Sequence, residues 1–239
     1  MIRFDYTDRV VLITGGSQGI GEGVASAFAG AGAQVHITGT RAASTDYAGD
    51  LSRFVYHQVR MENPDERARL ADALGPLDIL VNNAGTAGDD EYELAGYARV
   101  MEVNLTAVVD LCYRFRERLA TAAGAIVNVA SVGSYIGLRD RPAYTASKTG
   151  LLGFTRSIAD MWIRDGIRVN AVAPGFIDTQ IIEWARSDEA QFKAFLRQIP
   201  ARRIGRPDDV AAAVLFLASP QASYVVGHAL TVDGGYLLR

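Results

Sequence analysis

A glycine-rich turn joins a short apolar run to a helical pattern near the N-terminus, and few folds use that combination. Residues 10–13 (Val-Val-Leu-Ile) are wholly apolar and mostly β-branched, as in a central parallel strand that is covered on both faces. Residues 14–21 (Thr-Gly-Gly-Ser-Gln-Gly-Ile-Gly) follow, and the spacing of Val24, Phe28 and Ala31 then indicates a helix. Glycine lets a backbone approach a pyrophosphate closely, and a helix N-terminus offers free N–H groups and a positive dipole end. The turn therefore predicts a dinucleotide site, although a tight strand-to-helix turn needs glycine in any case.

The alternation of strand and helix patterns continues along the chain. Further strands are predicted at residues 34–38, 54–59, 77–81, 126–130, 167–173 and 229–232, and further helices at 64–74, 97–121, 142–165 and 207–218. This alternation predicts the α/β class: a Rossmann-like, doubly wound parallel sheet of about seven strands with helices on both faces. The chain contains no linker or repeat, so residues 1–239 are predicted to form a single domain.

Two segments are less regular. Residues 42–52 are short and polar, so the second crossover is predicted to be a stub rather than a full helix. Residues 180–199 carry apolar side chains at amphipathic spacing and predict one or two helices. These helices would form a lid over a substrate, ordinary packing or a subunit contact, and the pattern does not distinguish the three.

Composition excludes several classes of protein. The net charge is −3 and no basic block is present, so nucleic acid is not an expected partner. No run approaches the ~18 apolar residues of a membrane span, and no apolar signal region precedes the first strand, so we expect a cytoplasmic protein without a membrane contact. The single cysteine, Cys112, lies in a helical pattern and predicts a buried structural thiol. No set of metal ligands is predicted.

The end of the second strand bears on the cofactor. An NAD site usually carries an acid about 20 residues past the glycines, which binds the ribose hydroxyls. Here that region reads Thr38-Gly39-Thr40-Arg41 and holds no acid. Arg41 is suited to a 2′-phosphate, which favours NADP over NAD. Alternatively, Arg41 is only a solvated loop residue, and NAD then remains the cofactor.

A phenol and an amine lie one helical turn apart in Tyr144-Thr145-Ala146-Ser147-Lys148. Their i, i+4 spacing puts Tyr144 and Lys148 on one helix face, and a nearby positive charge favours the phenolate. Ser131 follows the predicted strand 126–130 and has a hydroxyl that suits a carbonyl or alkoxide oxygen. Such pairs are nevertheless common on amphipathic helices without any chemical role.

Two asparagine-containing segments complete the pattern. Asn83, Ala84 and Gly85 follow the predicted strand 77–81, where a glycine and amides suit close contact with a cofactor or simply make a turn. Asn104 lies inside the predicted helix 97–121, where it faces solvent or a neighbour, binds water or distorts the helix locally.

Taken together, these motifs resemble those of the short-chain dehydrogenase/reductase family. TGGSQGIG, NNAG, the Asn104 context, Ser131, YTASK and PGFIDT occur in family order from Val10 to Gly235. The glycine spacing and the four-residue step from Tyr144 to Lys148 resemble the single-domain oxidoreductase branch. Within it, the sequence is similar to 3-oxoacyl carrier-protein reductases.

The resemblance implies a role for each matching residue. Tyr144 would be the general acid in reduction and the base in oxidation, with Lys148 lowering its pKa and binding the nicotinamide ribose. Ser131 would hold the substrate oxygen, and Asn104 would keep a water that links Lys148 to solvent. The remaining matches would contact the cofactor: Gly15, Ser17, Gln18, Gly19 and Ile20 at the phosphates or ribose, Thr40 and Arg41 at the adenosine end, Asn83, Ala84 and Gly85 along it, and Pro174, Gly175, Ile177 and Thr179 at the nicotinamide end.

Three departures from the family pattern concern only the adenosine end. Gln18 stands where members that use NADP often have a basic residue, which weakens the NADP prediction. Gln58 replaces an Asp that commonly contacts adenine, so an amide contact is expected there. The short second crossover leaves this end more open than usual.

These residues predict a nicotinamide-dependent oxidoreductase that interconverts a small-molecule ketone and a secondary alcohol. The rival is a non-catalytic dinucleotide-binding sensor or scaffold, which would need the glycine turn but not Asn104, Ser131, Tyr144 and Lys148 together. Leu138, Ile182 and Trp184 suggest an apolar part to the pocket, while residues 139–141 (Arg-Asp-Arg) either meet an anionic group or form a solvated loop. The resemblance also implies a homotetramer, or a dimer, that pairs through the helices at 97–121 and 142–165.

Overall fold

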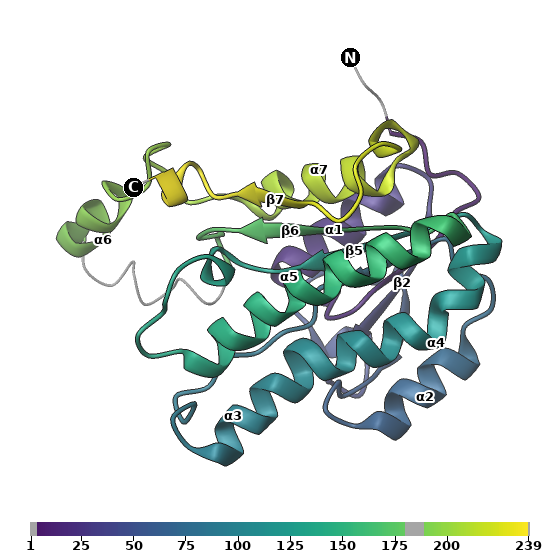
Figure 1. The fold of residues 1–239 in the computed structure, drawn as a ribbon, viewed down its shortest axis with the longest axis horizontal. Helices are drawn as coiled ribbons and strands as arrows, with labels where there is room; N and C mark the ends of the chain where they lie inside the picture. Colours follow the sequence, from purple (N-terminus) through teal and green to yellow (C-terminus); the bar gives the residue numbers. More distant parts are fainter. Residues whose placement is uncertain (1–3, 180–188, 239) are drawn as a thin grey trace.

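In the computed structural model, which describes residues 4–179 and 189–238, seven parallel strands form one sheet (Figure 1). The strand order is β3-β2-β1-β4-β5-β6-β7. This is the predicted doubly wound sheet, because the chain moves outward from β1 to β3 and then returns to place β4 on the other side of β1. The strands are β1 (Val10–Ile13), β2 (Gln34–Gly39), β3 (Val55–Gln58), β4 (Ile79–Asn82), β5 (Ala125–Val129), β6 (Arg168–Pro174) and β7 (Ala229–Val232).

Helices cover both faces of the sheet (Figure 1). Successive residues of a strand point to opposite faces, and β1 illustrates this, because Val11 and Ile13 belong to one core cluster and Leu12 to the other. The first cluster lies under α1 (Gly19–Gly30) and α7 (Pro207–Ala218). The second lies under the helices α2 (Pro64–Ala73), α4 (Ala107–Thr121) and α5 (Pro142–Trp162). Both faces of β1 are therefore buried, as its apolar sequence predicts.

The helix predicted at 97–121 is interrupted in the structure. It begins earlier, as α3 (Leu94–Met101), and a π-helical turn (Glu102–Thr106) separates it from α4. Asn104 lies in this turn, and its side-chain amide exchanges two hydrogen bonds of 2.8 Å with the backbone of Thr86. A side chain that bonds outside its own helix can stabilise such a bulge. The local distortion that the sequence allowed at Asn104 is therefore confirmed.

The two irregular segments differ in outcome. The crossover at 42–52 holds only a short 3₁₀ turn (Ser44–Asp46), so the predicted stub is confirmed. Helix α6 (Glu189–Leu196) falls within the predicted 180–199 region, whereas Ile181, Ile182 and Trp184 lie outside the described residues. Phe195 of α6 packs edge-on against Phe176 with ring centroids 4.6 Å apart, so at least this end of the segment has a packing role.

Cys112 is completely buried in the cluster under α2, α4 and α5. Burial raises the pKa of its thiol to about 12, so the group is protonated near neutral pH and is a structural thiol, as predicted. Among the described residues, no helix is long and apolar enough to cross a membrane.

Two glycines of α1 offer a matched test of how tightly the turn after β1 is packed. A Cβ at Gly21 would lie 2.2 Å from the carbonyl oxygen of Gly15, whereas a Cβ at Gly30 would meet no described atom within 4 Å. We expect Gly21→Ala to lower the free energy of unfolding by about 1–3 kcal/mol, because the turn must shift. Gly30→Ala should be neutral or stabilising by up to about 1 kcal/mol, because alanine is the better helix former.

Urea denaturation of both variants and the wild type measures the two effects. Equal stability of the two variants would contradict the close approach of helix and turn at Gly21.

Candidate active site

The predicted site residues gather at the carboxyl ends of the strands. The glycine turn follows β1, Thr40 and Arg41 follow β2, and Asn83 to Gly85 follow β4. Ser131 follows β5, and Pro174 to Thr179 end β6 and continue past it. In a parallel sheet these ends lie along one edge, and β1 and β4 meet there at the point where the strand order reverses.

The turn after β1 has the geometry of a phosphate cradle. Gly15 and Gly19 adopt positive φ angles of 62° and 59°, which other residues rarely tolerate. Helix α1 starts at Gly19, and Gln18 at its N-cap makes no side-chain capping bond among the described residues. The first N–H groups of α1 are therefore suited to an anion such as a pyrophosphate. Ser17 is buried beside this turn and Ile20 is partly buried.

Asn83 joins the loop after β4 to the turn after β1. Its side-chain amide donates to the carbonyl oxygens of Thr14 and Gly15 at 2.9 and 3.1 Å. The Thr14 hydroxyl in turn accepts from the backbone N–H groups of Asn83 and Ala84, each at 3.0 Å. The two loops thus form one rigid surface, in which the Asn83 side chain is a clamp and the backbone from Ala84 to Gly85 is the part that continues toward Lys148.

At the adenosine end, Arg41 is exposed and its guanidinium lies 4.7 Å from the centre of the Tyr47 ring. It also donates to the backbone carbonyl of Asp46. The Tyr47 hydroxyl accepts from the backbone N–H groups of Thr40 and Arg41 at 2.8 and 3.1 Å. Gln58 donates from its amide to the carbonyl oxygen of Thr40 at 3.3 Å, so it lies beside the same loop.

Tyr47 is a residue that the sequence reasoning missed. Partial burial acts to raise the pKa of its phenol, but hydrogen bonds, first of all to Ser17 and to the backbone of Arg41, bring it down to about 8. Its hydroxyl occupies N–H groups at the end of β2, where the ribose of a dinucleotide binds in this fold. The short crossover that leads to Tyr47 was visible in the sequence, but the return of this ring onto β2 was not.

Tyr144 and Lys148 lie on α5 beside the end of β5. Lys148 is 4% exposed, its Nζ donates to the carbonyl oxygen of Val129 at 2.8 Å, and that Nζ lies 5.8 Å from the centre of the Tyr144 ring. Gly133 lies against both Ser131 and Tyr144, because a Cβ there would lie 3.4 Å from the Ser131 hydroxyl and 3.4 Å from the Tyr144 ring. The phenol and the amine are therefore brought together, as their i, i+4 spacing predicted, and Ser131 lies next to them.

Burial dominates the electrostatics of this group. It raises the pKa of the Tyr144 phenol, while a hydrogen bond with Ser131 acts to lower it and the negative charge of Glu91 acts to raise it. Burial also lowers the pKa of Lys148 to about 8. An amine that titrates this close to neutrality, next to a phenol shielded from water, is an arrangement suited to moving a proton.

Asn104 is completely buried next to this pair. Besides Thr86, its amide Nδ2 bonds the hydroxyl of Ser147 at 3.1 Å, and that hydroxyl donates to the carbonyl oxygen of Tyr144 at 2.8 Å. A Cβ added to Gly85 would lie 3.4 Å from both Asn104 Oδ1 and Lys148 Nζ. The π-helical turn thus places Asn104 against the helix of Tyr144 and the loop after β4 at once.

The residues predicted for the nicotinamide end have different surroundings. Pro174 ends β6, and a Cβ at Gly175 would lie 2.8 Å from Cα of Asp233, so Gly175 packs against the loop after β7. Ile177 is buried in the core cluster under α1 and α7. Thr179 faces Gly19, because a Cβ there would lie 3.2 Å from the Thr179 methyl carbon. Thr179 therefore lies beside the phosphate cradle.

Known proteins of similar sequence share this architecture. Residues 15–237 match a family model described as enoyl-(acyl carrier protein) reductase. A 3-oxoacyl-[acyl-carrier-protein] reductase FabG of Vibrio cholerae is 39% identical, over 95% of this chain and 96% of the relative. Cis-4-hydroxycyclohexanecarboxylate dehydrogenase of Sinomonas cyclohexanicum is 40% identical, over 97% of both chains.

A solved structure agrees with the sequence comparison. The crystal structure of a putative 2-deoxy-D-gluconate 3-dehydrogenase from Agrobacterium tumefaciens, with bound NADP, matches with a TM-score of 0.89 and 36% identity over 100% of both chains. The chain therefore belongs to the short-chain dehydrogenase/reductase family of oxidoreductases. This confirms the family resemblance that its motifs indicated.

The lowered pKa of Lys148 predicts a pH-dependent contribution to stability. The folded protein releases this proton near pH 8, whereas the unfolded chain holds it to about 10.5, so between these values the unfolded chain binds more protons. Stability supplied by Lys148 should therefore increase as the pH rises through this window. The advantage of wild type relative to Lys148→Met should grow by up to roughly 3 kcal/mol from pH 8 to pH 10.5.

Urea denaturation of the two proteins across this range gives the difference directly, since titrating groups away from Lys148 cancel. A constant difference would mean that Lys148 titrates at its ordinary pKa and is not held in a desolvated site.

Proposed function

We propose that this protein is an NADP-dependent oxidoreductase that interconverts a ketone and a secondary alcohol, with Tyr144 as the general acid and base. The observation that carries the proposal is the group formed by the buried Ser131 and Lys148 and the half-buried Tyr144 at the carboxyl edge, next to a glycine turn suited to a pyrophosphate. The related proteins support the substrate class, because their names describe oxo, hydroxy and deoxy-gluconate compounds.

The nicotinamide cofactor supplies the hydride chemistry, and the chain supplies position and proton transfer. In reduction, the Tyr144 hydroxyl donates its proton to the substrate oxygen, which the Ser131 hydroxyl also bonds. In oxidation, the deprotonated Tyr144 accepts that proton. Lys148 stabilises the phenolate. A water held beside Asn104 is expected to connect Lys148 to solvent and to resupply its proton. The raised pKa of Tyr144 in the protein alone keeps the phenol protonated, ready to act as an acid.

A non-catalytic sensor or scaffold remains the alternative class. It would require the glycine turn and the hydrogen bonds of Asn83, and it would use Lys148 at the nicotinamide ribose. It would not require a half-buried phenol beside that amine or the hydroxyl of Ser131 next to the phenol. The catalytic function is therefore favoured.

Part of the charged stretch at 139–141 is bonded to the rest of the protein. Arg141 donates to the carbonyl oxygen of Gly88 and pairs with Asp89 at 2.8 Å. We therefore propose that Arg141 has a structural role rather than binding an anionic substrate group.

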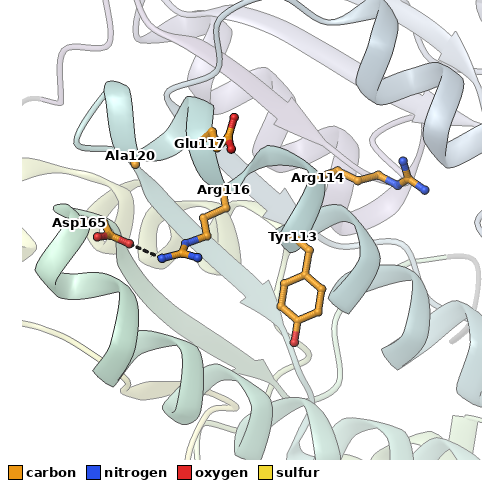
Figure 2. A pocket seen from close by; sticks show the side chains of 6 residues that line it. All are labelled: Tyr113, Arg114, Arg116, Glu117, Ala120 and Asp165. Atoms are coloured by element: carbon orange, nitrogen blue, oxygen red, sulfur yellow. Dashed lines mark hydrogen bonds and ion pairs between the residues drawn. The ribbon is translucent and has the colours of Figure 1, made fainter.

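A homotetramer, or a dimer, is also proposed, with α4 and α5 at the contact. The outer face of these helices exposes Tyr113 and Met161 by 59% and 64%. Figure 2 shows Arg116 of α4 reaching toward Asp165, which follows α5, at a hollow that Tyr113 also lines. None of the residues that line this hollow is a predicted site residue, so the face is open to a second copy without blocking the site.

The mechanism predicts a selective loss in Tyr144→Phe. This variant should lose turnover by about 10²-fold or more, since the proton donor is gone. Its affinity for NADPH should stay near that of wild type, because the ring and the helix are retained. Steady-state kinetics with a ketone that the wild type reduces, together with nicotinamide fluorescence, separates the two effects.

Tyr224→Phe is the matched control, because Tyr224 is fully exposed and should leave both quantities unchanged. Turnover near the wild-type rate in Tyr144→Phe would overturn the mechanism. Cofactor binding without turnover of any ketone or alcohol by the wild type would favour the sensor.

Cofactor choice is predicted to depend on Arg41. Its guanidinium lies at the end of β2 and has no acid beside it in the sequence 38–41, which suits a 2′-phosphate. Wild type should bind NADPH at least about tenfold more tightly than NADH, which is about 1.4 kcal/mol. Arg41→Ala should remove most of this preference by weakening NADPH alone.

Arg53→Ala is the control, since Arg53 bonds Ser26 and lies over the Phe54 ring, away from the end of β2. Fluorescence titration with both cofactors provides the affinities. Tighter NADH in the wild type, or an equal loss for both cofactors in Arg41→Ala, would assign the protein to NAD.

A further inference from the structure

A carboxylate that belongs to none of the family motifs is buried against the helix of Tyr144. Glu91 is 2% exposed and lies in the loop between β4 and α3. One of its oxygens accepts from the backbone N–H of Tyr144 at 2.8 Å, and the other accepts from the backbone N–H of Gly88 at 3.0 Å. The run of acids at 89–93 (Asp-Asp-Glu-Tyr-Glu) suggests a solvated loop, which is why the sequence did not single it out.

The first of these bonds satisfies a helix end. Tyr144 is the third residue of α5, so its N–H has no carbonyl partner within the helix. Arg141 at the N-cap makes no side-chain capping bond among the described residues, and Pro142 has no N–H. Glu91 therefore caps α5 from a different part of the chain, and its negative charge faces the positive end of the helix dipole.

Two more contacts join the same loop to the segment before Tyr144. Arg141 donates to the carbonyl oxygen of Gly88 and pairs with Asp89. The Tyr92 hydroxyl donates to the carbonyl oxygen of Arg139 at 2.6 Å. The loop that begins at Asn83 is thus attached to the start of the helix that carries Tyr144, and Glu91 is the buried part of that attachment.

We propose that Glu91 is a positioning residue for the reaction, which fixes Tyr144 through its backbone N–H and places a negative charge beside the phenol. This inference rests on the proposed function of Tyr144. The charge opposes the phenolate and therefore keeps the phenol protonated, consistent with its effect of raising the pKa of Tyr144.

Several other groups lie around the phenol and must be considered in a test by pH. Lys148 lies 5.8 Å from the centre of the Tyr144 ring on α5, and Ser131 bonds the phenol from the end of β5. Arg141 at the N-cap of α5 pairs with Asp89 of the same loop as Glu91. Asp89 is 97% exposed, so solvent screens its charge. It provides the matched control, because Asp89→Asn removes one negative charge from the same loop without touching the buried bonds.

The test is the pH profile of kcat in Glu91→Gln and Asp89→Asn. Removal of the buried charge stabilises the phenolate, so the midpoint assigned to Tyr144 should fall by about half a pH unit or more in Glu91→Gln. The shift should have the same direction for alcohol oxidation, which needs the phenolate, and for ketone reduction, which needs the phenol. Asp89→Asn should keep the wild-type midpoint. An unchanged midpoint in Glu91→Gln would overturn the proposal.

Glu91→Asp distinguishes the effect of the negative charge from that of side-chain length. It is also the variant to measure if Glu91→Gln does not fold. It keeps the charge but is one methylene shorter, so kcat should fall about tenfold or more, while the midpoint and the dissociation constant of NADPH stay near wild type. A wild-type kcat in Glu91→Asp would overturn the positioning role. Failure of the proposed function would look different, because Tyr144→Phe would then turn over substrate as fast as wild type.

Discussion

The burial of Lys148 is the constraint on which the rest of the site depends. An ammonium group this far from water is costly unless it is hydrogen-bonded, and the carbonyl oxygen of Val129 at the end of β5 supplies that bond. The bond fixes α5 against the sheet and sets the position of Tyr144 one turn earlier. It also leaves an amine with a pKa of about 8 next to a phenol, which is the arrangement that the proposed proton transfer requires.

The surroundings of this pair come from segments that are far apart in the chain. The π-helical turn brings Asn104 against Ser147, the loop after β4 brings Gly85 toward Lys148, and the same loop brings Glu91 to the N–H of Tyr144. Asn83 then connects that loop to the phosphate cradle after β1. The loop after β4 therefore contacts both the turn after β1 and the helix of Tyr144, so the proposed cofactor and proton-transfer sites share one supporting segment.

Most of the fold and the identity of the central residues followed from local patterns. Apolar β-branched runs located the strands to within a few residues, because both faces of this sheet are buried. Helical spacing located the helices. Tyr144 and Lys148 were found because their i, i+4 spacing already places them on one helix face, and Ser131 was found because it follows an apolar strand pattern and matches a family motif. Glu91 and Tyr47 were not found, because each acts on a segment distant in sequence. In a sequence, an acidic run or a loop tyrosine reads the same whether the side chains are solvated or folded back onto the site.

In the proposed function the dinucleotide runs from the turn after β1 to the phenol of Tyr144, and a crystal structure of the protein with NADPH tests this most directly. We expect the pyrophosphate at the N-terminus of α1, the 2′-phosphate beside Arg41, and the nicotinamide ring next to Tyr144 and Ser131 with its ribose at Lys148. A nicotinamide ring placed away from Tyr144, with the cofactor otherwise bound, would contradict the claim that this buried group is the active site.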